Sequence, residues 1–253
     1  MFTFPLTLFG VEPFVNTLST SFDGVDERID VPDDNSFDVT SISVFLWIKS
    51  GTVDPFVRQV IIGRNRITQA EVCWSIEVLN TNQIRIRIYE DISTEKTYRI
   101  PANLLVMNGN WHQIGFTYSQ STDTLTLYAD GAAVVAPVKN VDNAMPAGLN
   151  IVAQRMDIGC GSNGAASNPV LFFDGNIDEV SIWNRALTLG EIGLIYNSGT
   201  PTNLANISFF GDCITWYRMG DGDNATTIFD QKSSNDGSLI NMNAGNYETD
   251  VPP

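Results

Sequence analysis

Short runs in which apolar and polar residues alternate recur along most of the chain. In the run QIRIRIYED, three isoleucines fall on one face, and Arg85 and Arg87 fall on the other. This two-residue period is that of a β-strand. The preceding run VCWSIEVLN also alternates, and a short TNQ stretch separates the two. Together the two runs predict a β-hairpin.

Other strand-like runs have the same character. In SISVFLWIKS (41–50), Val44, Leu46 and Ile48 fall on one face and the aromatic residues between them fall on the other. The runs NWHQIGFTYS (110–119) and TLTLYADGAAVVAP (124–137) predict a second hairpin, with ADG turning the chain inside the second run.

One segment, TLGEIGLIYNSG, reads as a short helix. Thr188 is placed to cap it, Glu191 follows three residues later, and Gly199 comes just after its end. The chain shows no long helices, no βαβ alternation and no repeat array. The sequence therefore predicts an all-β fold, a two-sheet antiparallel β-sandwich or jelly roll with one short helix.

Composition narrows the range of partners. The 253 residues suffice for one large all-β domain or two small domains. The formal net charge of -15 repels nucleic acid and anionic membranes, so neither is expected as a partner. No run of about 18 apolar residues could span a membrane. Three widely spaced cysteines (Cys73, Cys160 and Cys213) favour reduced thiols over disulfides or zinc.

The first 20 residues, MFTFPLTLFGVEPFVNTLST, are apolar and lack Lys and Arg. Pro5, Glu12 and Pro13 interrupt the segment, so it makes a poor signal peptide. An exposed apolar segment is a liability unless a neighbour covers it. We therefore interpret residues 1–20 as an assembly arm, whose apolar contacts are Phe2, Phe4, Leu6, Leu8, Phe9 and Phe14.

Three motifs in a fixed order resemble a known family. SFDGVDERIDVPDDNSFDVTSISVFLWIKS, NWHQIGFTYSQSTDTLTLYADG and FDGNIDEVSIWNRALTLGEIGLIYNSG resemble the opening, central hairpin and closing part of the laminin-G-like, concanavalin-A-like jelly roll. The resemblance covers about residues 21–199 and implies the same two-sheet sandwich. Trp111 and Trp183 lie inside strand motifs and are expected to anchor its core.

The stretch WYRMGDGDNATTIFDQKSSNDGSLINM (216–242) is rich in Asp, Asn and Gly. Its spacing does not fit an EF-hand, because Thr226 and Lys232 would occupy the glycine and glutamate positions. It resembles another laminin-G-like element, displaced toward the C-terminus. Either it completes the sandwich in a permuted order, or it is the vestige of a second repeat; its short length favours the first. We expect one domain over 21–242, with 200–242 as a closing segment and 243–253 as a tail.

Catalysis is not expected. The sole histidine, His112, lies in a strand and is interpreted as structural. Retaining glycosidases need two carboxyl groups about 5–5.5 Å apart. The adjacent Asp178 and Glu179 would point to opposite faces of a regular strand.

A structural calcium ion is one hypothesis. Asp178 would point inward if Val180 and Ile182 face the core, and a buried carboxylate needs hydrogen bonds or a cation. Asp23 lies in a motif that the resemblance places nearby, and relatives often hold Ca²⁺. The alternative is that both carboxylates accept backbone N–H groups in tight turns.

The resemblance implies binding to sugars, proteins or neighbouring copies. Glycan binding would use exposed aromatic rings, for which Trp74, Tyr89 and Tyr98 are candidates, although all three also fit half-buried sandwich positions. The combination of motifs is also similar to bacteriophage structural proteins. The leading hypothesis is a non-catalytic decoration, knob or fibre component on the virion exterior, in contact with other virion proteins or its own copies and binding host glycan. The alternatives are a free extracellular lectin and, less favoured, a glycan hydrolase.

Overall fold

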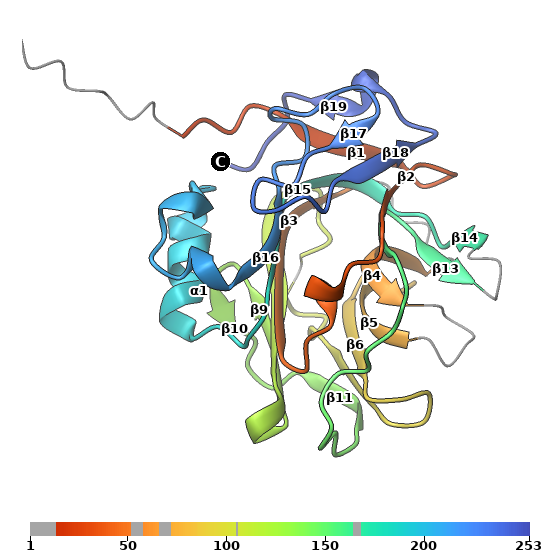
Figure 1. Cartoon of the computed structure of the whole chain (residues 1–253), viewed down its shortest axis with the longest axis vertical. Coiled ribbons are helices and arrows are strands. Elements are labelled where there is room, and N and C mark those ends of the chain that lie inside the picture. Colours follow the sequence, from red (N-terminus) through yellow and green to blue (C-terminus); the bar gives the residue numbers. More distant parts are fainter. Residues whose placement is uncertain (1–13, 52–57, 66–71, 105, 164–167) are drawn as a thin grey trace, which may run out of the picture.

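The computed structural model describes residues 14–51, 58–65, 72–104, 106–163 and 168–253. In this part of the chain, two large antiparallel sheets face each other, as Figure 1 shows. Apolar side chains from both sheets form one core between them. The predicted all-β sandwich with one short α-helix is therefore confirmed.

Sheet 1 has eight strands within the described residues, in the order β10–β9–β8–β3–β15–β1–β19, with β16 also paired to β15. Because β15 pairs with β3, β1 and β16, it is the central element of this sheet. The strands are β1 (Ser19–Asp23), β3 (Ile42–Ser50), β8 (Trp111–Ser119), β9 (Thr124–Ala129), β10 (Ala132–Ala133), β15 (Asp174–Trp183), β16 (Cys213–Tyr217) and β19 (Tyr247–Glu248).

Sheet 2 has nine strands within the same residues, in the order β11–β7–β6–β5–β4–β12–β2–β18–β17. The predicted hairpin of two alternating runs is its β5–β6 pair. The strands are β2 (Arg28–Val31), β4 (Gln59–Asn65), β5 (Val72–Val78), β6 (Ile84–Tyr89), β7 (Glu95–Arg99), β11 (Val138–Asp142), β12 (Met156–Ile158), β17 (Thr227–Ile228) and β18 (Gly237–Ile240).

The remaining elements are short. A separate two-stranded ribbon joins β13 (Gly161–Asn163) to β14 (Asn168–Val170). Helix α1 (Leu189–Tyr196) begins at the predicted cap, where Thr188 and Glu191 form a reciprocal capping box. Single 3₁₀ turns lie at Asn35–Phe37, Gln120–Thr122, Asn197–Gly199, Leu204–Asn206, Phe210–Asp212 and Ala244–Asn246.

Strand alternation sorts the side chains of β3 onto two faces, as predicted. Val44, Leu46 and Ile48 are buried in the core between the sheets. Phe45 belongs to a second apolar layer on the outer face of sheet 1, and the ring of Trp47 stacks on that of Tyr196. Both faces of sheet 1 are thus covered by apolar packing.

Helix α1 lies against the outer side of sheet 1 and contributes to this second layer (Figure 1). Ile192 and Ile195 pack there with Trp183, which is fully buried, as predicted. Trp111 is not a core anchor: its ring is half-buried, and its Nε1 donates to a carboxylate oxygen of Asp250 (2.9 Å). The indole needs a hydrogen-bond acceptor, and this one lies at the surface.

The two predicted domain boundaries need correction. Strand β1 already begins at Ser19, and residues 14–18, assigned above to the arm, contact the sandwich through Phe14, Asn16 and Thr17. At the other end, β19 pairs with β1, so residues 243–253 are not a free tail. Open strand edges favour such pairing, because it satisfies their N–H and C=O groups. The arm residues from Phe2 to Phe9 lie outside the described residues.

Residues 200–242 complete the sandwich on both sides. Strand β16 pairs with β15 in sheet 1, whereas β17 and β18 extend sheet 2 beside β2. Figure 1 shows β17 and β18 beside the N-terminal strands β1 and β2 at one end of the molecule. Residues 200–242 therefore contribute strands to both sheets, and in sheet 2 they lie beside β2, one of the first strands of the chain.

Two further observations concern the cysteines and the length of the helices. Cys73, Cys160 and Cys213 are free and buried, and burial raises the pKa of each thiol. No helix in the described ranges is long and apolar enough to cross a membrane.

The contacts of Phe14 predict a loss of stability on its truncation. Its ring stacks on Trp216 with 6.3 Å between centroids, and the guanidinium of Arg218 lies 4.5 Å from the ring centre. We expect Phe14→Ala to lower the free energy of unfolding by about 1–3 kcal/mol in urea denaturation. The matched control Val15→Ala, at a side chain 56% exposed, should change it by less than about 0.5 kcal/mol. Equal effects of the two substitutions would contradict the packing described for Phe14.

Candidate functional site

A groove of about 410 Å³ opens on the outer face of sheet 2. Strand alternation builds it: the isoleucines of β6 point into the core, so Arg85 and Arg87 between them point outward. We call it the arginine groove. Its lining residues are Arg58, Leu79, Arg85, Arg87, Glu95, Thr97, Arg99, Asn140 and Val141.

Ion pairs and amide contacts hold the arginine side chains of the groove in place. Nε of Arg85 donates to Oε2 of the fully buried Glu77 (2.9 Å), and Nη2 of Arg87 donates to Oε2 of Glu95 (2.9 Å). Nε of Arg99 donates to Oδ1 of Asn140 (2.7 Å). Such contacts fix the guanidinium planes while leaving further N–H donors for a ligand.

Positive charge exceeds negative charge here, although the chain as a whole carries a net charge of -15. Four arginines line the groove, and the carboxylates that contact them in the described residues are Glu77 and Glu95. Burial lowers the pKa of Arg58, and the charges of Arg85 and Arg87 lower it further, against the opposing effect of Glu77. The neighbouring cations therefore disfavour the charged form of Arg58, and an anion in the groove would relieve this.

Thr97 lies in the same groove with an unused hydroxyl. It pairs in register with Arg87, and its side chain is 5% exposed. Its Oγ1 has no hydrogen-bond partner among the described residues. Buried hydroxyls without partners are costly, so a ligand oxygen that reached this atom would remove that cost.

The three predicted glycan-binding rings are not exposed. Trp74 is buried in the core against Phe116, and Tyr98 is buried with its hydroxyl donating to Asp142. Tyr89 is 5% exposed, with the guanidinium of Arg87 over its ring at 4.9 Å. Trp74 and Tyr98 occupy inward positions of β5 and β7, whereas Thr97 and Arg99, the neighbours of Tyr98 in β7, line the groove. The alternation of arginines in β6 was the sequence signal that pointed to this outer face.

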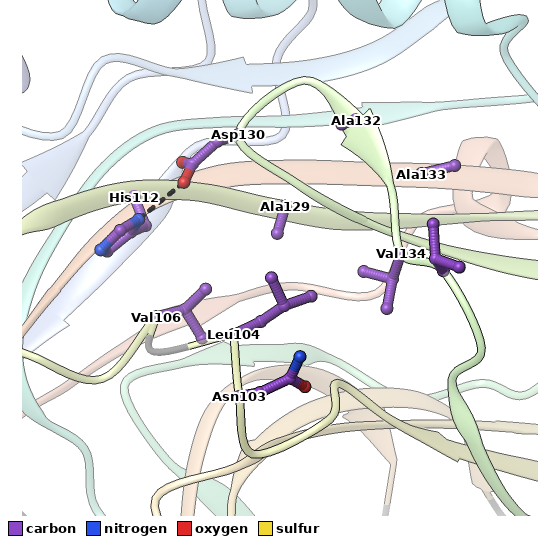
Figure 2. Close-up of a pocket in the computed structure, with 10 residues that line it drawn as sticks. Asn103, Leu104, Val106, His112, Ala129, Asp130, Ala132, Ala133 and Val134 are labelled. Carbon is purple, nitrogen blue, oxygen red and sulfur yellow. Dashed lines mark hydrogen bonds and ion pairs between the residues drawn. The ribbon is translucent and has the colours of Figure 1, made fainter.

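Figure 2 shows a second cavity, of about 470 Å³, near the open edge of sheet 1 at β10. Leu104, Val106 and Val134 contribute apolar side chains to its lining. His112 and Asp130 face each other, with Nδ1 and Oδ2 separated by 2.8 Å. The cavity is mainly aliphatic and offers a glycan few polar groups.

His112 is engaged on both sides of its ring. Besides the contact with Asp130, its Nε2 lies 3.2 Å from Oδ1 of Asn108. Asp130 also accepts the backbone N–H of Gln113 (3.1 Å). The described lining residues include no Ser, Thr or Cys that His112 could activate as a nucleophile.

Asp178 and Glu179 do not point to opposite faces, because β15 has a β-bulge at this position. Glu179 has φ 48°, and the register with β3 shifts between Asp178 and Ser181. Ile177 and Val180, on either side of the pair, both lie in the core, so both acidic residues lie on the outer face of sheet 1. Asp178 therefore does not share the inward face of Val180.

Both carboxyl groups are buried among hydrogen-bond donors. Asp178 accepts from Nδ2 of Asn16 (2.7 Å) and from the N–H of Glu179 (2.8 Å). Glu179 accepts from Nε1 of Trp216 (2.6 Å), with Nε of Arg218 at 3.4 Å. Burial raises the pKa of Glu179 to about 7, and burial together with the charge of Glu179 raises that of Asp178. The pair is too enclosed to meet a glycan.

The structure does not bring Asp23 and Asp178 together. Asp23 pairs in register with Asp174, four residues before Asp178, a separation of about 13 Å along the strand. Asp23 accepts the N–H groups of Val25 (2.8 Å) and Asp26 (3.4 Å), which is the turn alternative. In the described residues, no group of three or more His, Cys, Asp or Glu could hold a metal ion. The two-aspartate calcium site is thus wrong as a geometry; calcium binding itself stays a prediction.

The two-sheet sandwich and its arginine groove define the class of protein: a lectin-like jelly roll with an open sheet face. Residues 23–193 match the family model Laminin_G_3, described as the concanavalin A-like lectin/glucanases superfamily. The chain belongs to this family, as the sequence motifs indicated. No curated protein matches the sequence.

Solved structures show the same fold. One is a protein from Bacteroides ovatus that is proposed to bind carbohydrate, with a TM-score of 0.63 and 18% identity. The match covers 95% of this chain and 62% of the Bacteroides chain, so this chain spans about three fifths of that protein. The match to the heptameric SAP-like pentraxin of Limulus polyphemus has a TM-score of 0.50 and 16% identity. It covers 72% of this chain and 82% of the pentraxin chain. The match to the NanB sialidase of Streptococcus pneumoniae has a TM-score of 0.50 and 16% identity. It covers 73% of this chain and 27% of the sialidase chain.

The raised pKa of Glu179 predicts a specific pH dependence of stability. Folding raises this pKa from 4.5 to about 7, so the stabilising contribution of the protonated form is complete below pH 4.5 and is lost as the pH rises through about 7. We expect the free energy of unfolding to fall between pH 5 and pH 8, and Glu179→Gln to reduce that fall by an amount on the order of 2 kcal/mol.

Urea denaturation at several pH values measures this difference. Glu248→Gln, a substitution at an exposed carboxylate, is the matched control and should keep the wild-type pH profile. A wild-type profile in the Glu179→Gln variant as well would contradict the assignment.

Proposed function

We propose that this protein is a non-catalytic carbohydrate-binding protein whose binding surface is the arginine groove. The observation that carries the proposal is the groove itself, where four arginines, Thr97 and Asn140 gather on the one outer sheet face that the second apolar layer leaves open. Membership of a lectin and glucanase superfamily supports a sugar as ligand.

The groove has the properties that sugar recognition needs. Its volume lies within the range of about 300–1,000 Å³ that is usual for small-ligand sites. Ion pairs preorganise the guanidinium groups of Arg85 and Arg87, which reduces the entropy lost on binding. Leu79 and Val141 add apolar surface for the carbon face of a sugar ring.

Binding without hydrolysis is favoured by the state of the acidic groups. The carboxylates of Glu77 and Glu95 are both engaged by arginine side chains. A glycosidase needs one acid that donates a proton and one free carboxylate that acts as nucleophile or base. The groove therefore supports a binding role for these residues.

Substitution of Arg99 tests the proposal. We expect the wild-type protein to bind a subset of glycans on an array, and Arg99→Ala to bind the same glycans about tenfold more weakly, because hydrogen bonds to charged groups contribute about 1.5–3 kcal/mol. Arg28→Ala is the matched control, since Arg28 lies outside the groove on the same sheet face. If the wild type binds no glycan, or if the two variants bind equally, the proposal is wrong.

We also propose the biological setting suggested by the sequence resemblance: the exterior of a bacteriophage virion, with an extracellular lectin as the alternative. Neighbouring virion proteins or further copies of the chain would receive residues 1–13, while Phe14 on Trp216 would be the point of attachment to the domain. Glycan binding by the groove suits either setting, because both expose the protein to surface sugars.

Deletion of residues 2–13 tests this setting. We expect the deleted chain to fold but to be lost from virion-sized particles, measured by sedimentation and mass spectrometry. The deletion stops before Phe14, because Asn16 and Thr17 contact the domain. The single substitution Val15→Ala is the control and should leave incorporation unchanged. Normal incorporation of the deleted chain, or a small free species from the source, would contradict the virion role.

A further inference from the structure

We infer that the sugar bound in the arginine groove is acidic, with a carboxylate or sulfate group held between the guanidinium groups of Arg87 and Arg99 and the hydroxyl of Thr97. The inference rests on the proposed carbohydrate-binding function and specifies the class of sugar. Three independent features of the groove carry it: its charge, the unpartnered hydroxyl, and the strand register that places them together.

Charge is the first feature. Arginines outnumber the carboxylates that contact them in the described part of the groove, while the chain as a whole is strongly acidic. A neutral sugar would leave that excess uncompensated. A planar guanidinium matches a carboxylate or sulfate through two parallel N–H donors, so an oxyanion uses this excess directly.

The hydroxyl of Thr97 is the second feature. More than nine tenths of this side chain is buried, yet Oγ1 has no hydrogen-bond partner among the described residues. A hydroxyl in this position can donate one hydrogen bond to a ligand oxygen. Oxyanions accept such bonds on several oxygens, so they satisfy the hydroxyl and the neighbouring arginines together.

Register is the third feature. Thr97 lies opposite Arg87 across the β6–β7 pair, and Arg99 lies two residues further along β7 on the same face. Asn140 fixes Arg99 from β11, and Glu95 fixes Arg87. One anionic group placed over Thr97 would therefore meet a cation from each of two adjacent strands.

The overall charge restricts the ligand to a sugar with isolated anionic groups. A nucleic acid or another dense polyanion would experience repulsion from the net charge of -15 over most of the surface. A single carboxylate or sulfate needs only the local excess in the groove. Uronic acids, sialic acids and sulfated sugars share this chemistry.

The experiment compares matched acidic and neutral sugars by isothermal titration calorimetry with the full chain. The pairs are a galacturonate oligosaccharide and its methyl ester, sialyllactose and lactose, and a sulfated disaccharide with its desulfated form. We expect at least one acidic member to bind tenfold or more tightly than its neutral partner, with affinity falling as salt rises. The pair that shows the difference identifies the source of the anion.

Two groove variants and one control variant separate binding from folding. Arg87→Gln removes the charge and should abolish the preference for the acidic member, while Arg28→Gln outside the groove should keep it. Thr97→Val has the same shape and removes the unpartnered hydroxyl, so we expect an unchanged or higher unfolding temperature together with several-fold weaker binding. Loss of fold in Arg87→Gln would leave Thr97→Val as the deciding variant.

The outcomes distinguish this inference from the proposed function. Equal affinity for acidic and neutral sugars, or unchanged binding by both groove variants, would overturn the inference while the carbohydrate-binding role stands. If no glycan binds, thermal shift with inorganic sulfate decides: stabilisation of the wild type but not of Arg87→Gln supports the anion site and overturns the carbohydrate-binding role. No glycan binding and no sulfate effect overturns both.

Discussion

The pleat of the β-strand is the constraint on which the rest of this structure depends. Each inward isoleucine of β6 commits its neighbours to the outer face, so burying the core also places Arg85 and Arg87 in the groove. On sheet 1 the outward side chains include aromatic residues, and α1 and the segment before β16 cover them. The molecule therefore has one outer sheet face closed by apolar packing and one open and polar.

The bulge in β15 shows what happens where this constraint is broken. The positive φ of Glu179 sets two consecutive acidic side chains on one face. Their charges are then accommodated by donors from segments distant in the chain, Asn16 at the start and Trp216 near the end. A local irregularity of the backbone is thus tied to long-range contacts that hold the N-terminal segment on the sandwich.

How much the sequence predicts depends on the range of the interactions. Alternation and capping are local, so the β5–β6 hairpin, the two faces of β3 and the cap at Thr188 were all predictable. The faces of Asp178 and Glu179 were not, because a bulge leaves no clear mark in residue pattern.

The glycan site was sought on aromatic residues, although the arginines of the adjacent face were already visible in the sequence. The pairing of β19 with β1 joins the two ends of the chain, and nothing in the local sequence of either strand marks it.

That pairing also has a consequence for the order in which the protein is made. Sheet 1 receives β1 among its first strands and β19 among its last, and sheet 2 likewise combines β2 with β18. Until β18 and β19 have been synthesised, β1 and β2 each have an unpaired edge, and such edges invite association with other chains. The sandwich can close only after these late strands have been made, and such a long separation in sequence between paired strands slows folding.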